Sequence, residues 1–154
     1  MDTIDILRAT PFFSGLDSDE LDAVARCIVP ETHRKGDVII RESQPGERLY
    51  LVRSGRVRVE KAQGGKQMKL AELGEGAAFG EMSLIDSVPT SATVTAVEDA
   101  ELLSIGRLDL NVLLTWNPIL AAKMWRAFTL VLSTRVRDMN DRMLAKFGED
   151  ALRA

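Results

Sequence analysis

Cysteine is almost absent from this chain, which has one, Cys27, in 154 residues. A single cysteine excludes an internal disulfide framework and fits a reducing compartment, so we expect a cytoplasmic protein. The apolar neighbours Val24 and Ile28 indicate a buried structural thiol rather than a reactive one.

Histidine is equally scarce, with His33 the only one. One histidine cannot form the His and carboxylate cluster that holds a catalytic metal, and no serine or cysteine has a second imidazole as its base. His33 stands beside Arg34 and Lys35, as a surface residue would. We therefore expect no catalytic residues, no metal and no enzymatic activity.

Long hydrophobic runs are missing too. No stretch approaches the roughly 20 apolar residues of a membrane span, and residues 1–8 carry two acids instead of a signal sequence. The sequence predicts neither a membrane protein nor a secreted one.

A positive charge excess is also lacking, because the net charge is −3. A nucleic-acid-binding domain usually carries a strong basic excess. Only seven residues follow Phe147, too few for two more helices. We expect no direct DNA binding.

The first 30 residues have helix signals. Residues 3–9 read as a short helix that ends before Pro11. A second helix has Asp17 as N-cap with Glu20 three residues later, the pattern of a capping box. Its apolar residues recur at helical spacing, and Pro30 is expected to stop it.

From His33 to about Leu103 the apolar period changes to two and glycine recurs. Alternation at Val57 and Val59, the Gly64-Gly65 turn and similar segments predict about seven or eight short strands, as in an antiparallel jelly roll or barrel. The expected fold class is α+β: an antiparallel β-roll flanked by short N-terminal helices and one long C-terminal helix.

The long helix is predicted from Asn117, as its cap, and Pro118 to about Phe147, with a stop at Gly148. One stripe repeats at alternating steps of four and three: Trp125, Thr129, Leu132, Val136, Met139 and Met143. A second stripe comprises Met124, Phe128 and Val131. One stripe can pack on the roll, and the other suggests a partner helix and a homodimer through residues 118–147. The expected organisation is a roll with N-terminal helices over 1–115, a lid and dimerisation helix over 116–147, and a tail over 148–154.

Two segments carry a ligand-binding signal: Phe79-Gly80-Glu81-Met82-Ser83-Leu84-Ile85 and, soon after, Ser91-Ala92-Thr93-Val94. Glycine allows close backbone approach, and a helix N-terminus offers unpaired N–H groups to a phosphate. The pair closely resembles the phosphate-binding cassette of cyclic-nucleotide-binding domains, the family of bacterial catabolite activators and kinase regulatory subunits. The segments Lys35-Gly36-Asp37, Gly55-Arg56-Val57 and Gly74-Glu75-Gly76 agree with that family in order and spacing.

The resemblance implies a nucleotide site, with cAMP or cGMP as the ligand and no cofactor. Glu81 would accept a ribose hydroxyl, while Gly80 and the backbone of Met82 and Ser83 would approach the sugar-phosphate. Ser91 and Ala92 would hold phosphate oxygens. The apolar wall behind the base would comprise Val59, Leu70, Ala71 and Phe79. Thr129, Ser133 or Thr134 on the long helix would contact the base.

Thr90 departs from the family, which has an arginine against the cyclic phosphate at this position. Losing one partner of a buried charge pair costs about 2–5 kcal/mol, which is roughly 30- to several-thousand-fold in affinity. Arg126 or Arg135 of the long helix could substitute, and the sequence does not decide between them.

The sequence thus predicts a stand-alone regulatory domain that senses a nucleotide-type effector and relays it to a protein partner through its C-terminal helix, with ligand binding weakened or altered at Thr90. Two alternatives stay open. One is a ligand-free interaction or scaffold module; the other is the effector-domain fragment of a bacterial transcription regulator.

Overall fold

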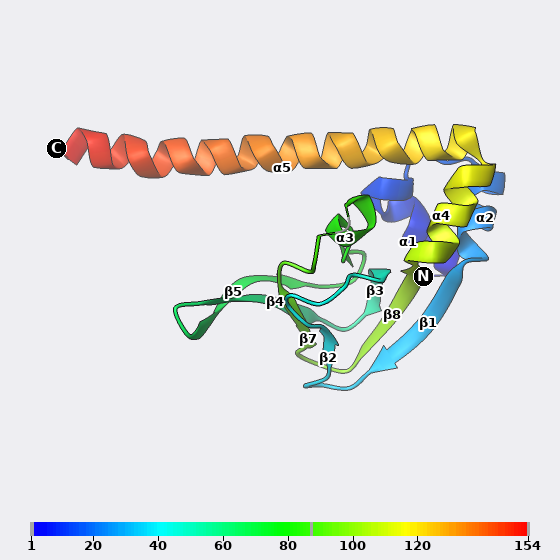
Figure 1. Cartoon of the computed structure of the whole chain (residues 1–154), viewed down its shortest axis with the longest axis horizontal. Coiled ribbons are helices and arrows are strands. Elements are labelled where there is room, and N and C mark those ends of the chain that lie inside the picture. Colours follow the sequence, from blue (N-terminus) through cyan, green and yellow to red (C-terminus); the bar gives the residue numbers. More distant parts are fainter. Residues whose placement is uncertain (1, 87, 154) are drawn as a thin grey trace.

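The computed structural model of the chain describes residues 2–86 and 88–153. Its helices are α1 (Thr3–Ala9), the 3-10 helix η1 (Pro11–Phe13), α2 (Ser18–Ala25), α3 (Met82–Ile85), α4 (Arg107–Trp116) and α5 (Pro118–Arg153). Its strands are β1 (Ile28–His33), β2 (Val38–Ile40), β3 (Arg48–Ser54), β4 (Val57–Gln63), β5 (Lys66–Leu73), β6 (Ala78–Phe79), β7 (Thr93–Ala96) and β8 (Ala100–Gly106). Figure 1 shows α5 lying across one side of the strands.

The capping box of α2 is confirmed. Asp17 accepts the Glu20 N–H, and the Glu20 carboxylate accepts the Asp17 N–H, both at 2.9 Å. The predicted stop at Pro30 is wrong, because α2 already ends at Ala25 and Pro30 lies within β1. β1 is an edge strand, where a residue without an N–H is tolerated.

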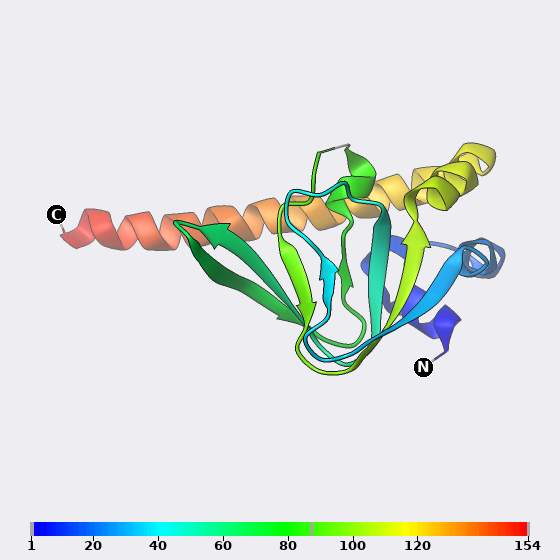
Figure 2. The ribbon, with the colours of Figure 1, turned by 60° about the horizontal axis from the view of Figure 1, so that its bottom comes forward.

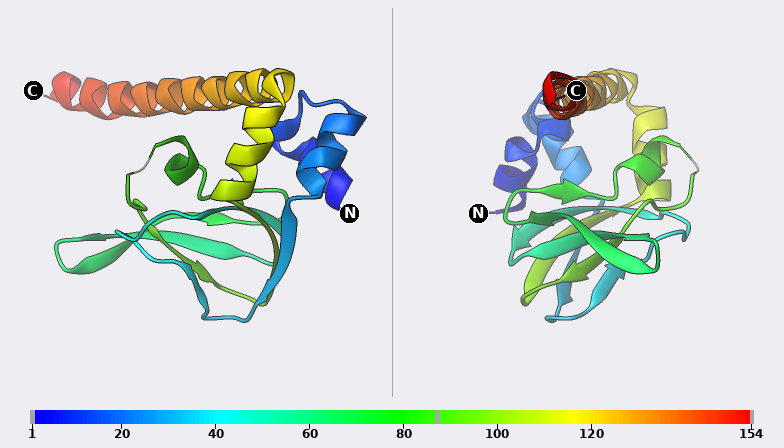
Figure 3. Two further views of the ribbon diagram at one scale, coloured as in Figure 1. Left: turned by 45° about the vertical axis from the view of Figure 1, so that its right-hand side comes forward. Right: turned by 90° about the vertical axis from the view of Figure 1, so that its left-hand side faces the viewer.

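The strands form two antiparallel four-stranded sheets, in the orders β1-β8-β3-β6 and β2-β7-β4-β5. They face each other as a roll (Figure 2), and the helices gather beyond the outer face of the first sheet (Figure 3). The predicted fold, a β-roll flanked by short N-terminal helices and a long C-terminal helix, is confirmed.

Strand β3 explains why a continuous apolar run occurs in the sequence. Leu49 and Leu51 belong to the cluster that packs under the helices, whereas Tyr50 and Val52 belong to the cluster between the sheets. Successive side chains point to opposite faces of a strand, so a strand covered on both faces has no exposed polar positions.

Helix α4 was not predicted, and it gives Asn117 a second role besides the predicted one at the start of α5, where its carbonyl accepts the Ala121 N–H at 2.9 Å. The Asn117 side chain donates to the Leu113 carbonyl at 2.8 Å and so caps the end of α4. α5 begins at Pro118 as expected but passes through Gly148 to Arg153. The predicted stop at Gly148 is therefore wrong.

Helix α5 is anchored along its first half only. Phe128 stacks on Phe12 with ring centroids 4.3 Å apart, and Lys123 pairs with Glu20 at 2.5 Å. Met124, Phe128 and Val131, the second predicted stripe, pack into the core. Residues 136–148 are exposed, and Figure 1 shows this end of α5 extending beyond the roll. Among the described helices, none is long and apolar enough to cross a membrane.

Candidate functional site

The turn from β6 into α3 requires glycine at Gly80. Its φ is +85°, and a Cβ there would lie 2.7 Å from the Arg48 carbonyl oxygen. Such a conformation and such a close approach suit only a residue without a side chain. The tight turn brings Glu81 and the start of α3 into a cavity beneath α5.

This cavity has a volume of about 410 Å³, within the roughly 300–1,000 Å³ of small-molecule sites. Its walls combine an apolar part from the strands with a polar part from the segment around α3. The described residues that line it are Ile40, Val59, Ala71, Leu73, Ala78, Phe79, Gly80, Glu81, Met82, Asp86, Val88, Pro89, Thr90, Ser91, Ala92, Val94 and Arg135.

Most of the predicted site residues outside α5 are brought together here, with two exceptions. Leu70 does not line the cavity and its side chain is 59% exposed. Where β4 pairs with β5, Val59 lies opposite Ala71 and Glu60 opposite Lys69, so Leu70 is the extra residue of a β-bulge. The position that the family resemblance gave to Leu70 in the apolar wall is therefore wrong. Ser83 lies in α3, and its side chain is outside the described part of the structure.

The apolar wall is rigid behind Phe79. Phe79 stacks on Tyr50, with ring centroids 5.0 Å apart, and both residues are buried in the cluster between the sheets. Burial raises the pKa of the Tyr50 phenol, an effect that indicates a poorly hydrated environment. Phe79 thus gives the wall an aromatic side chain that is held in place by Tyr50.

Glu81 is the most buried acid of the site, with 7% exposure. Its carboxylate accepts a hydrogen bond from the Arg135 guanidinium at 2.5 Å. The sequence left the choice between Arg126 and Arg135 open, and the structure brings Arg135 to the cavity. A buried carboxylate needs such a partner, because an isolated charge is costly away from water.

Thr90 is held by the turn between β2 and β3. Its hydroxyl donates to the Arg41 carbonyl and accepts the Gln44 N–H at 3.1 Å. Its own N–H donates to the Gln44 carbonyl at 2.9 Å. The Thr90 side chain thus supports the loop and carries no charge to the cavity.

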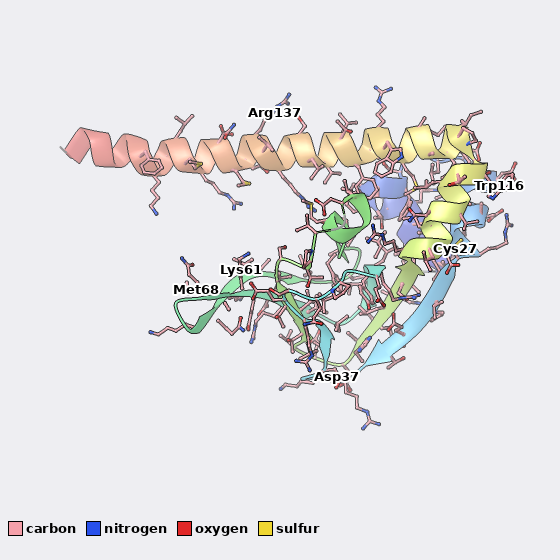
Figure 4. All side chains as sticks on the ribbon, in the orientation of Figure 1. Cys27, Asp37, Lys61, Met68, Trp116 and Arg137 are labelled. Carbon is pink, nitrogen blue, oxygen red and sulfur yellow. The ribbon has the colours of Figure 1, made fainter. Side chains whose placement is uncertain are left out.

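Ser91 and Ala92 complete the polar rim. Lys61 of β4 donates to the Ser91 carbonyl at 3.1 Å, and Figure 4 labels this lysine on the β4–β5 hairpin. Lys61 places a cation beside the rim, although it does not line the cavity.

The polar residues expected from α5 do not reach the site. Thr129 and Thr134 donate to the carbonyls of Trp125 and Leu130 one turn earlier, and neither they nor Ser133 line the cavity. Sequence reasoning missed Asp86, whose side chain accepts the Val88 N–H at 3.2 Å. Among the described lining residues, Arg135 is the one cation against two carboxylates, Glu81 and Asp86.

The described residues contain no group of three or more His, Cys, Asp or Glu side chains that could hold a metal ion. The cavity itself presents the Glu81–Arg135 pair and an apolar wall.

Comparisons with known proteins agree with this geometry. Residues 30–115 match the family described as the cyclic nucleotide-binding domain. The chain is 36% identical over 133 residues to the cyclic AMP receptor protein of Thermus thermophilus, a match covering 86% of this chain and 60% of that protein. The chain thus spans about 60% of the length of this curated relative.

Solved structures with a similar fold include further cyclic nucleotide-binding proteins. A cyclic nucleotide-binding domain from Methylobacillus flagellatus shares 28% identity at a TM-score of 0.80, covering 94% of this chain and 82% of that one. The regulatory subunit of a cAMP-independent protein kinase A from Trypanosoma brucei shares 30% identity at a TM-score of 0.64, covering 68% of this chain and 39% of that one. That structure is a triple mutant bound to cAMP, and one of its three substitutions changes a threonine to an arginine.

Proposed function

The chain belongs to the cyclic nucleotide-binding domain family, and we propose that it is a regulatory module that binds a cyclic nucleotide weakly and relays its occupancy through α5. The observation that supports this most is the cavity itself. Its lining combines the polar residues Glu81 and Ser91, the apolar residues of the strands, and Arg135 of α5, which pairs with Glu81.

Each part of this lining suits one part of a cyclic nucleotide. The Glu81 carboxylate can accept a hydrogen bond from a ribose hydroxyl. The backbone at Ser91 and Ala92 faces the space where a cyclic phosphate would lie, and Phe79 and Val59 would contact the base. Arg135 already pairs with Glu81, so a ligand that engages Glu81 also changes the surroundings of α5.

The binding is proposed to be weak because the cavity carries little positive charge. The described lining residues include one cation, Arg135, and two carboxylates, Glu81 and Asp86. The Thr90 hydroxyl already forms hydrogen bonds with the backbone of Arg41 and Gln44. A charge-assisted hydrogen bond is worth about 1.5–3 kcal/mol, and Thr90 supplies none. The cAMP-bound kinase regulator with its threonine-to-arginine change is consistent with this reasoning.

The relay requires α5 to contact something beyond its own roll. Val136, Met139 and Met143 fall on one stripe of the exposed half of α5 and are each more than half exposed. Apolar residues at alternating steps of four and three pair helices as coiled coils. We propose a homodimer through this stripe, in which a ligand at Arg135 shifts the position of α5.

Calorimetric titration of the chain with cAMP and with cGMP tests the ligand. We expect saturable heat, with a dissociation constant weaker than about 1 μM because one charge-assisted contact is missing. Adenosine, which lacks the phosphate, is the matched control and should bind more weakly. If neither cyclic nucleotide produced heat at millimolar concentration, the proposal would fail.

A further inference from the structure

A second hollow lies on the other side of α5, between this helix and η1. It has a volume of about 710 Å³ and is open to solvent along its length. Its floor is apolar and includes Pro11, Ala127, Leu130 and Val131. Leu130 is 59% exposed there, so a large aliphatic side chain faces water at the centre of a concave surface.

The rim of this groove is basic. Lys123, Arg126 and Arg135 line it, and no acidic side chain is among its described lining residues. Lys123 and Arg135 reach away to Glu20 and Glu81, whereas Arg126 forms no ion pair with any described residue. An apolar floor between cations is complementary to an apolar surface flanked by carboxylates.

The groove also has the dimensions of a helix-binding site. It follows α5 from Lys123 to Arg135, which corresponds to about 18 Å at 1.5 Å per residue, or a little over three helical turns. Helices that dock in grooves present apolar anchors at steps of three and four residues. A concave surface of this length favours one helix over a flat membrane, which would require protruding apolar residues.

One side of the groove stays open in the proposed dimer. Its residues Ala127 and Leu130 lie between the dimer-stripe residues Trp125, Thr129 and Leu132 in sequence. One residue turns the helix by about 100°, so Ala127 is about 200° away from Trp125 and from Thr129. A second copy seated on the dimer stripe would therefore leave the Ala127 side of the groove uncovered.

We propose that the groove between η1 and α5 binds an acidic amphipathic helix of a partner protein. Leucine-like side chains of this helix would cover Leu130 and Val131, and carboxylates beside them would pair with Arg126 and the two flanking cations. The proposal rests on the groove alone and holds whether or not the cavity binds a nucleotide.

The test uses a helical peptide of about four turns, with leucines at steps of three and four flanked by glutamates, and a twin with lysine in place of each glutamate. Amide chemical shifts of the labelled full chain are recorded during titration. We expect the glutamate peptide to shift the amides of Gly15, Arg126 and Leu130 with a dissociation constant below about 1 mM. The control peptide with lysines should bind at least about 10-fold more weakly. Added salt should reduce the difference in affinity between the two peptides.

Matched variants locate the site. Arg126→Glu and Leu130→Asn should each weaken the peptide about 10-fold or more, whereas Arg142→Glu and Leu144→Asn, exposed on the same helix beyond the groove, should leave it unchanged. Equal binding of the two peptides, shifts confined to residues 136–147, or no shifts at millimolar peptide would overturn the proposal. So would adsorption to phosphatidylserine vesicles, lost in the same groove variants, without a response to the peptide. None of these measurements includes a nucleotide, so their failure is distinct from a failure of the cavity to bind one.

Discussion

At the scale of single residues, Thr90 forms a structural contact at the rim of the cavity and carries no charge there. Its hydroxyl joins the segment before β7 to the turn between β2 and β3, through Arg41 and Gln44. The fold therefore uses this side chain to hold the two segments together. Arg135 approaches the cavity from α5 instead and is already paired with Glu81.

Glu81 provides a prediction at this scale. If its carboxylate accepts the ribose hydroxyl, 2′-deoxy cyclic AMP should bind about 10- to 150-fold more weakly than cAMP, because a hydrogen bond to a charged group is worth about 1.5–3 kcal/mol. Calorimetry of the chain with both ligands measures this ratio.

The same two ligands titrated into the Glu81→Gln variant complete a double-mutant-type cycle, in which one change is made in the ligand and the other in the protein. Its neutral side chain should shrink the ratio between the two ligands, since the contact is no longer charge-assisted. An unchanged ratio in the variant would show that the ribose hydroxyl is bound elsewhere.

Local patterns predicted single residues well where the contact is local in sequence. The Asp17–Glu20 box follows from spacing alone, and Gly80 from the turn it must make. Leu70 was placed in the apolar wall by the family resemblance, but it is the extra residue of the bulge opposite Val59 and Glu60 and does not line the cavity. Arg135 could be named only as one of two candidates, because the docking of α5 on the roll selects it.

At the scale of elements, the start of α2 should respond to acid. The Glu20 N–H lowers the pKa of Asp17 from its ordinary value of 3.8. A lowered pKa contributes stability that is present above the unfolded-state pKa and is lost as the pH falls through the folded-state value. This part of the stability should therefore disappear below about pH 4.

The Asp17→Asn variant checks this expectation, because asparagine caps a helix about as well as aspartate but does not titrate. Urea midpoints of both proteins should differ at pH 6 and converge as the pH is lowered toward about 2.5. A gap that stayed constant across this range would contradict the assignment of the cap.

Helix α5 provides the second prediction at this scale. Met139→Lys places a charge in the middle of the proposed dimer stripe, where a buried unpaired charge is strongly unfavourable. Sedimentation at tens of micromolar protein should change from dimer to monomer.

Leu108→Lys, an exposed aliphatic position on α4, is the control and should remain dimeric. If the wild-type chain sedimented only as a monomer at this concentration, the proposed dimer would be contradicted.

The elements themselves were predicted unevenly. The strands were predicted from the alternation of apolar residues and from the glycine turns, and α5 was predicted from its helical apolar spacing and from Pro118. Helix α4 begins at Arg107, and its N-cap residue Gly106 has no side chain to cap it. Asn117 therefore serves two helices: its side chain caps the end of α4, and its carbonyl accepts the Ala121 N–H at the start of α5. Gly148 failed to stop α5, since glycine within an exposed helix costs only about 1 kcal/mol.

At the scale of the whole molecule, two clusters share the same strands. β3 and β8 contribute alternate residues to a cluster under the helices and to a cluster between the sheets. The N-terminal helices, α4 and the first half of α5 all join the first cluster. A change at α5 is thereby linked by packing to the sheet that carries Phe79.

Arg135 adds a polar link to this packing. It borders the cavity on one side of α5 and the groove on the other. An effector in the cavity and a helix in the groove would therefore meet at one side chain, and any coupling between them must be reciprocal in their affinities.

The central claim is that this cavity is a cyclic nucleotide site weakened by the uncharged Thr90. Parallel calorimetric titrations of the wild type, Thr90→Arg and Thr90→Val with cAMP test it most directly. Thr90→Val removes the hydroxyl's contacts with Arg41 and Gln44 without adding charge, so it separates loop effects from charge. We predict that Thr90→Arg binds cAMP at least about 30-fold more tightly than the wild type, while Thr90→Val does not gain affinity. Equal or weaker binding by Thr90→Arg, in a variant that remains folded, would contradict the claim.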